Sequence, residues 1–224
     1  MGKPSWGGKR YGTGRKPAGF RRHDSPHRPR LALDARHPVH VVLRLKDDVP
    51  SLRTRTMYGV VHRVCARYLG RPDFRVVHVS IQRNHLHFLI EARDQAALRN
   101  GMQGLAICAL RALNAALGRI GKIFAYRYHA THIVTARQAR NALAYVLNNW
   151  RKHRQDCVSP RTLSAAIDPY SSGLAFSGWT ERFAIPEGYS PLPTSPPSTR
   201  LLARDWRRHG LVEPFERPGP IHVW

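Results

Sequence analysis

The chain has 224 residues, enough for one ordinary domain with appendages or at most two small domains. Lysine and arginine total 37 against 14 acidic residues, which gives a formal net charge of +23. A charge of this size favours nucleic acid as the partner over an anionic membrane or a ribosomal role. The hydrophobic content of 42% excludes a chain that is disordered throughout.

Membrane and secretory segments are not expected. The sequence has no apolar run of about 18 residues, and its N-terminus has no apolar core of the secretory type. Cys65, Cys108 and Cys157 are far apart and form no Cys-x-x-Cys pair. This spacing argues against a disulfide framework or a cysteine zinc site, so we expect a reducing cytoplasm. From the lack of an apolar run we expect no membrane partner.

The elements begin after a basic segment. Residues 1–35 are rich in Gly, Pro, Arg and Lys, which predicts a flexible basic arm that either grips phosphates or has no specific role. The strand PVHVVLRL (38–45) follows, with Val41 and its alternate neighbours on one face and His40, Val42 and Arg44 on the other. The remaining elements are predicted as helix 51–69, strands 74–82 and 85–92, helix 94–117, strand 127–134 and helix 136–153.

This order of elements is β-α-β-β-α-β followed by a helix. It is typical of the ferredoxin-like split β-α-β arrangement, an α+β fold with an antiparallel sheet and helices on one face. After Cys157 the sequence is rich in proline and turn residues, and only 199–210 has a helical pattern. We therefore expect residues 156–224 to be an irregular appendage that wraps the core and not an independent domain.

Two histidines stand two residues apart in NHLHFLIEA (84–92). Alternate residues of a strand share a face, so His85 and His87 would project side by side and could grip one divalent metal ion. Histidines on a strand are more often packing residues, and the spacing alone does not decide between these interpretations.

The last predicted helix carries a polar line beside its apolar stripe. In this line Tyr145 and Asn149 lie one turn apart, so both side chains can point toward the same part of the sheet. A half-buried tyrosine and an asparagine at a helix end are the structural alternatives. Helical periodicity does not choose between them.

These motifs resemble those of a known family. RNHLHFLI (83–90) is similar to the HUH motif (His, hydrophobic residue, His) that follows a short Asn-containing turn in single-tyrosine transposases. AYVLNNWRKH (144–153) resembles the Tyr-x-x-x-Asn helix of REP-associated tyrosine transposases, which belong to the wider group that mobilises insertion sequences as single strands. The segment 123–149 also looks like that family. The resemblance covers about residues 36–155, which would form an HUH transposase-like catalytic domain.

The resemblance implies a role for each matching residue. His85, His87 and Asn149 would hold Mg²⁺ or Mn²⁺, although this set would also accept Zn²⁺. Tyr145 would be the nucleophile of a single-strand DNA endonuclease and strand transferase that cleaves and rejoins single-stranded or hairpin DNA through a 5′-phosphotyrosine. A metal would compensate for the weak nucleophilicity of a phenol and for the charge of the phosphodiester.

The sequence also departs from the family pattern. Family members often continue Asn-Pro-Val-Arg after the metal-binding asparagine, whereas WRK (150–152) follows here, so we expect a longer helix. His129 and His132 would face opposite ways on a strand; either one approaches the site as a phosphate contact or both are structural. His40 would lie beside the histidine strand, where it either supports the metal site or packs in the core.

Basic residues around the predicted site are candidates for DNA contacts. Exposed lysines and arginines often form only a solvated surface, but the net charge favours DNA here. In the appendage, Arg207 and Arg208 follow Trp206, and we expect this segment either to contact DNA or to pack over the site as a lid. The predicted DNA-binding residues are Arg83, Arg127, Arg137, Arg140, Arg151, Lys152, Arg154, Arg207 and Arg208.

Two other functions remain open. The chain could be a domesticated, non-catalytic nucleic-acid-binding protein with the same fold, although the intact tyrosine, histidines and asparagine favour an enzyme. A related HUH replication initiator or relaxase is disfavoured, because those proteins commonly carry extra domains or a second tyrosine. We expect a monomer or homodimer in the bacterial cytoplasm or nucleoid.

Overall fold

The computed structural model describes residues 32–158 and 165–219. The chain divides into two units, residues 1–31 and 32–224, and every described residue belongs to the second. Nearly all of the predicted basic arm therefore lies outside the described residues. Within the described part of the chain, no helix is long and apolar enough to span a membrane.

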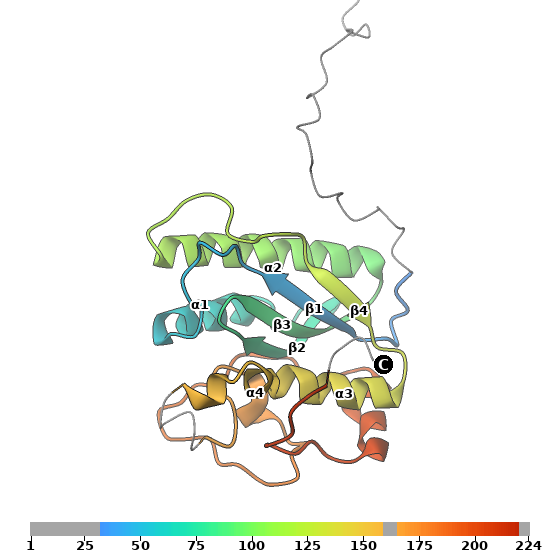
Figure 1. The fold of residues 1–224 in the computed structure, drawn as a ribbon. Coiled ribbons are helices and arrows are strands. Elements are labelled where there is room, and N and C mark those ends of the chain that lie inside the picture. Colours follow the sequence, from blue (N-terminus) through green and yellow to red (C-terminus); the bar gives the residue numbers. More distant parts are fainter. Residues whose placement is uncertain (1–31, 159–164, 220–224) are drawn as a thin grey trace, which may run out of the picture. The chain divides into compact units, whose positions relative to one another are not determined.

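Four antiparallel strands form the sheet at the centre of this unit (Figure 1). They lie in the order β2-β3-β1-β4, so β3 and β1 are the two inner strands. The strands are β1 (Val39–Arg44), β2 (Phe74–Ile81), β3 (His85–Ala92) and β4 (His129–His132). This sheet and its helices confirm the predicted α+β class and ferredoxin-like order.

Alternating side chains give the sheet two different faces. On β1, Val41 is buried in the main hydrophobic core, whereas its neighbours His40 and Val42 point to the opposite face. On β3, Phe88 belongs to the same core and His87 points away from it. The predicted alternation is confirmed in both strands, and it gathers histidines on one face of the sheet.

Two helices cover the face that carries the main core. They are α1 (Arg55–Ala66) and α2 (Gln95–Ala116). α2 approaches β2 closely at Gly101, where a Cβ atom would lie 2.1 Å from the ring of Phe74. The glycine that weakens the helix in isolation thus permits close packing on the sheet.

The other face of the sheet is covered by α3 (Ala136–Leu147) and by parts of residues 165–219 (Figure 1). A capping box between Thr135 and Gln138 starts α3. A second hydrophobic cluster joins the apolar stripe of α3 to Leu89 of β3 and to Trp206. The helices α1 and α2 of the ferredoxin-like core share one face, and the added helix takes the other.

The single helix predicted over 136–153 is interrupted. α3 ends at Leu147, and the short helix α4 spans Asn149–Lys152. Asn148 separates them and donates a side-chain hydrogen bond of 2.8 Å to the carbonyl of Glu213. Asparagine side chains readily bond backbone groups outside regular helices. The expectation of a longer continuous helix is therefore wrong.

Residues 165–219 are attached to the sheet and its surroundings by buried polar contacts. Arg53 donates two hydrogen bonds, of 2.8 and 2.9 Å, to the carboxyl group of Asp168, which is 0% exposed. Glu91 of β3 accepts hydrogen bonds from Ser198 and Thr199. The other short helices of the described residues are η1 (Gln155–Cys157), η2 (Ser172–Ala175), α6 (Arg200–Ala203) and η3 (Asp205–His209).

Candidate active site

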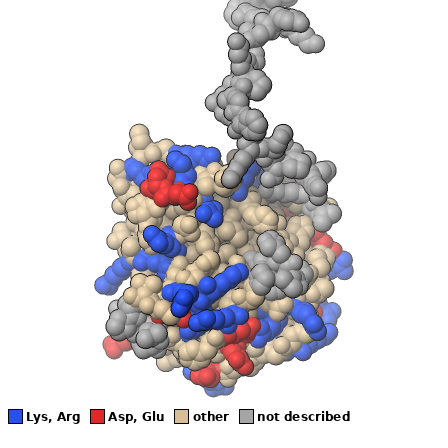
Figure 2. Space-filling model, viewed as in Figure 1, with Lys and Arg blue, Asp and Glu red and all other residues tan. Residues whose placement is uncertain are grey.

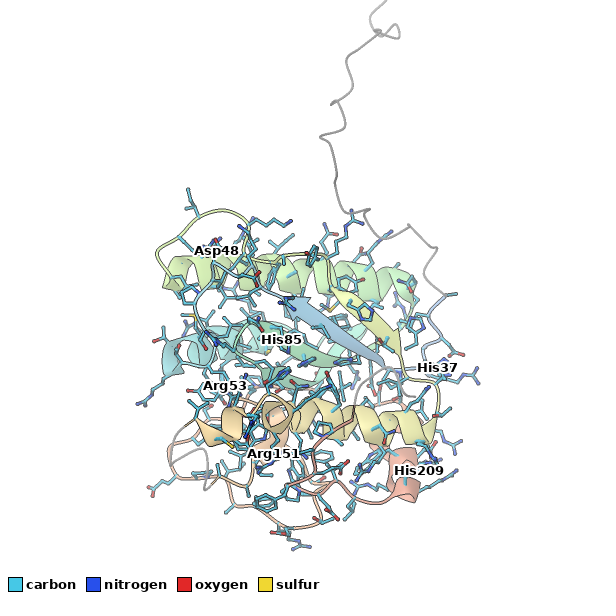
Figure 3. The ribbon with its side chains drawn as sticks, in the orientation of Figure 1. His37, Asp48, Arg53, His85, Arg151 and His209 are labelled. Carbon is cyan, nitrogen blue, oxygen red and sulfur yellow. The ribbon has the colours of Figure 1, made fainter. Side chains whose placement is uncertain are left out.

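His85 and His87 lie side by side at the beginning of β3, on the face that α3 covers. Their ring centroids are 4.6 Å apart. The intervening Leu86 belongs to the main core on the opposite face, so the pleat of the strand holds both imidazoles together. Figure 3 shows His85 on the side of the sheet nearer to α3 and α4.

His85 is oriented by its neighbour Asn84. Nδ1 of His85 lies 2.9 Å from Oδ1 of Asn84, so Nδ1 carries the proton and Nε2 carries the lone pair. Burial, with smaller contributions from His153 and Arg44, lowers the pKa of His85 to about 4. The imidazole is therefore neutral at neutral pH, as a metal ligand has to be.

His87 is more deeply buried, with an exposed fraction of 2%. Burial lowers its pKa well below the usual 6.5. Its Nδ1 atom lies 3.0 Å from Nε2 of His40, which extends from the neighbouring strand β1. Nε2 of His87 is buried and has no hydrogen-bond partner among the described residues. An unbonded buried nitrogen is costly in free energy, so this atom is a candidate ligand atom.

Asn149 brings an amide group to the two histidines from the first residue of α4. It is 0% exposed, and neither Oδ1 nor Nδ2 has a hydrogen-bond partner within the described residues. Polar contact with Asn149 nevertheless raises the pKa of both His85 and His87, against the larger effect of burial. The amide thus lies near both imidazoles without meeting hydrogen-bond geometry, as expected for three ligands of one ion.

Tyr145 reaches the same place from α3. Its ring centroid lies 5.4 Å from that of His87 and 5.7 Å from that of His40, with the rings edge to face. Nζ of Lys152 lies 3.5 Å from the tyrosine hydroxyl and 4.7 Å from the ring centroid. The structure therefore brings together all four residues that the sequence singled out, and it adds a lysine beside the hydroxyl.

The donor set fits a divalent metal ion. It consists of two imidazole nitrogens and one amide oxygen, and two of these atoms, Nε2 of His87 and Oδ1 of Asn149, are buried without a hydrogen-bond partner in the described ranges. The described residues contain no group of three or more His, Cys, Asp or Glu side chains that could hold a metal. A mixed set of this kind suits Mn²⁺, and Mg²⁺ would complete its shell with water and phosphate oxygens.

Most of the predicted DNA-binding side chains are exposed. On the face shown in Figure 2, lysine and arginine side chains are more prominent than acidic ones, including at the level of α3. Figure 3 shows His209 toward the beginning of α3 and Arg151 beyond its end. The exposed residues are Arg83, Arg127, Arg137, Lys152, Arg154, Arg207 and Arg208.

The structure argues against two of the predicted DNA contacts. Arg151 is 6% exposed, and its guanidinium group donates to Asp156 and to backbone carbonyls of residues 165–214. Arg140 pairs with Glu216 and also donates to a backbone carbonyl. Both guanidinium groups are bound within the protein, so we assign them a structural role in place of DNA binding.

The strand register places two further residues near the site, and a third follows α4. Arg44 of β1 pairs directly with His85, and its side chain is 58% exposed. The register also places His129, and not His132, on the histidine face. His153 follows α4, with its ring centroid 5.4 Å from that of His85. Sequence alternation assigns the face of each strand residue, but only the register shows which residues become neighbours.

Comparison with known proteins places the chain in a family. Residues 35–149 match the family model described as transposase IS200 like. Among solved structures, the chain is similar to a REP-associated tyrosine transposase bound to a REP hairpin, with 16% identity and a TM-score of 0.44, over 58% of this chain and 74% of that one. It is also similar to a bacterial tRNA(His) guanylyltransferase-like protein in complex with ATP, with 13% identity and a TM-score of 0.38, over 60% and 69% of the two chains.

No curated protein matches the chain. The family assignment therefore rests on the sequence match, which spans just over half of the 224 residues. The matched range contains both histidines of β3, the tyrosine of α3 and the asparagine that starts α4. As the sequence motifs predicted, the chain belongs to the IS200-like transposase family.

Proposed function

We propose that this protein is a metal-dependent tyrosine enzyme that cleaves and rejoins single-stranded or hairpin DNA. Tyr145 is the nucleophile in this proposal, and His85, His87 and Asn149 hold Mg²⁺ or Mn²⁺. Membership of a transposase family and a net charge of +23 both support DNA as the substrate. A REP-associated transposase has been solved with a REP hairpin, so a hairpin is a suitable first substrate.

The observation that carries the proposal is the position of Tyr145. Its ring lies 5.4 Å from that of His87, next to buried polar atoms that have no hydrogen-bond partner among the described residues. A tyrosine that served only for packing would need no such surroundings. A nucleophile that attacks a phosphate beside a metal ion would need them.

The proposed reaction exchanges one phosphate ester for another. Oη of Tyr145 loses its proton to water and forms a bond to phosphorus, while the bond from phosphorus to the 3′ oxygen of the preceding nucleotide breaks. That oxygen takes up a proton, which leaves a 5′-phosphotyrosine and a free 3′-OH. Rejoining is the reverse, with a 3′-OH as nucleophile and Tyr145 as leaving group, so no external energy source is required.

The residues around the tyrosine have distinct parts in this reaction. The ammonium group of Lys152, 3.5 Å from Oη, would stabilise negative charge that develops on that oxygen during attack and departure. Arg44, exposed beside His85, is placed to contact a phosphate. When bound, the metal ion would polarise the scissile phosphate and neutralise part of its charge.

The test is the formation of a covalent protein–DNA adduct. Labelled hairpin and unstructured single-stranded DNA are incubated with the protein in Mg²⁺, Mn²⁺ or EDTA. We expect the wild type to form an adduct with metal but not with EDTA, and Tyr145→Phe to form none. Tyr126→Phe is the matched control, because this tyrosine is 76% exposed and precedes β4.

Two results would count against the proposal. An adduct that persists in Tyr145→Phe would contradict the assignment of the nucleophile. Tight DNA binding by the wild type without an adduct, across a panel of hairpins and both metals, would support a non-catalytic binding protein.

A further inference from the structure

His40 is a buried histidine that contacts both a candidate metal ligand and the candidate nucleophile. Its exposed fraction is 3%. Its Nε2 atom lies 3.0 Å from Nδ1 of His87, and its ring meets that of Tyr145 edge to face at 5.7 Å. An apolar side chain would fill the same space without the polar contact, so the nitrogen–nitrogen contact needs a separate explanation.

The contact between the two nitrogens requires one proton between them. If His87 donates from Nδ1, its Nε2 atom carries a lone pair. If His40 donates from Nε2 instead, neutral His87 carries its proton on Nε2. That atom is buried and makes no hydrogen bond with the residues that the structure describes, so a proton there would be an unsatisfied buried donor. The first arrangement avoids this cost once a metal ion takes up the lone pair.

We propose that His40 is a positioning residue that accepts a hydrogen bond from Nδ1 of His87 and so keeps the lone pair of Nε2 available for a metal ion. This inference rests on the metal site of the proposed function. Hydrogen bonds of this kind fix the orientation and tautomer of metal-binding histidines and make them more basic. Asn84 does the same for His85 through a contact of 2.9 Å, so both histidines offer Nε2.

The contact with Tyr145 gives His40 a second effect. Because one side chain lies against both the ligand and the nucleophile, its removal would loosen two parts of the site at once. A readout that does not depend on DNA cleavage is therefore needed to isolate the effect on the metal ion.

Two amide substitutions separate hydrogen bonding from packing. The amide of His40→Gln reaches the position of Nε2, whereas that of His40→Asn reaches only the position of Nδ1. We expect His40→Gln to keep the affinity for Mn²⁺ within about threefold of wild type and His40→Asn to weaken it roughly 10- to 100-fold. Affinity is measured without DNA by calorimetry or by electron paramagnetic resonance, on variants whose thermal unfolding shows that they are folded.

A control and a second measurement complete the test. His209→Asn changes an exposed histidine toward the other end of α3 and should leave Mn²⁺ affinity unchanged (Figure 3). If His40→Asn does not fold, nitrogen-15 spectra of the wild type with saturating Mg²⁺ decide: the proposal predicts that Nε2 of His40 carries no proton, and a proton on that atom would overturn it.

The possible failures are distinguishable. Equal Mn²⁺ affinity in His40→Gln, His40→Asn and wild type would overturn the role of His40 but leave the metal site standing. No Mn²⁺ binding by the wild type would overturn the metal site itself, and with it the inference about His40.

Discussion

Buried polar groups at the two ends of β3 differ in whether they have hydrogen-bond partners. At one end Glu91, which is 3% exposed, accepts four hydrogen bonds of 2.7–2.9 Å from Ser198 and Thr199. At the other end Nε2 of His87 and the amide of Asn149 are equally buried and have no hydrogen-bond partner in the described residues. Folded proteins rarely leave such atoms unbonded. The first end therefore serves stability, and the second is suited to a ligand.

This difference also has an energetic consequence. An unsatisfied buried polar group costs about 1–3 kcal/mol. Residues 165–219 contribute stability that offsets this cost, because they supply the partners of Glu91 and help to cover α3. Groups that stabilise the fold and groups suited to a ligand thus lie at different ends of one strand. A substitution at the Glu91 end should lower the free energy of unfolding, whereas one beside His87 should weaken metal binding with little loss of stability.

The largest effect on stability is expected at the fully bonded end. Glu91→Leu removes the acceptor of four hydrogen bonds and leaves their donors without a partner. We expect the free energy of unfolding to fall by about 3–5 kcal/mol in urea titrations. Glu181→Leu, at an exposed glutamate, is the control and should change it little. If the free energy of unfolding falls as little in Glu91→Leu as in the control, the hydrogen bonds of Glu91 do not stabilise the fold as we infer.

The next effect separates two adjacent basic residues. Arg151→Met breaks buried hydrogen bonds to residues 156 and 165–214 and should lower the free energy of unfolding by about 2–3 kcal/mol. Lys152→Met, at an exposed position, should change stability little but slow adduct formation, because it removes the ammonium group 3.5 Å from Oη of Tyr145. The opposite pattern in the two variants would show that their roles are exchanged.

The pH dependence of stability provides a smaller effect, away from the candidate ligands. Burial lowers the pKa of His78 from the usual 6.5 to about 4. Between these values the unfolded chain binds a proton that the folded chain does not, so stability is fully present above pH 6.5 and falls as the pH decreases toward 4. His40 and His85 shift in the same direction and add to the fall.

His78→Gln tests this contribution. Glutamine does not titrate, so this substitution removes the pH dependence of the position, whatever becomes of the contact between Nδ1 and Ser172. Because His78 is only partly buried as a residue, we expect the loss of stability between pH 7 and pH 4 to shrink by about 1–2 kcal/mol, less than the full shift would give. Urea titrations across this range measure it, with His209→Gln, at an exposed position, as the matched control. An unchanged or steeper fall in His78→Gln would contradict the assigned cause.

The smallest effect on stability is expected at the unbonded end, and it has the opposite sign. Asn149→Leu removes a buried amide that has no hydrogen-bond partner in the described residues. We expect the metal-free protein to be as stable as wild type or more stable by about 1 kcal/mol, while Mn²⁺ binding is lost. Thermal unfolding with and without Mn²⁺ measures both properties. A large destabilisation without metal would show that Asn149 is a structural residue.

Much of the fold follows from local sequence patterns. The alternation in β1 and β3 predicts which face each histidine takes, and the order of elements predicts the sheet. The break at Asn148 and the burial of Arg151 are not predictable in this way, because their partners lie in residues 165–214, distant in sequence. The motifs predicted the tyrosine, histidines and asparagine of the site, but the place of Arg44 depends on the register.

The most direct test of the proposed function is to identify the residue that becomes linked to DNA. Wild-type protein is incubated with a cleavable hairpin and Mn²⁺, digested with protease and nuclease, and examined by mass spectrometry. We predict that a nucleotide is attached through its 5′ phosphate to the peptide that contains Tyr145, and that EDTA prevents the attachment. Attachment to another residue, or a 3′-phosphate linkage, would contradict the proposed mechanism.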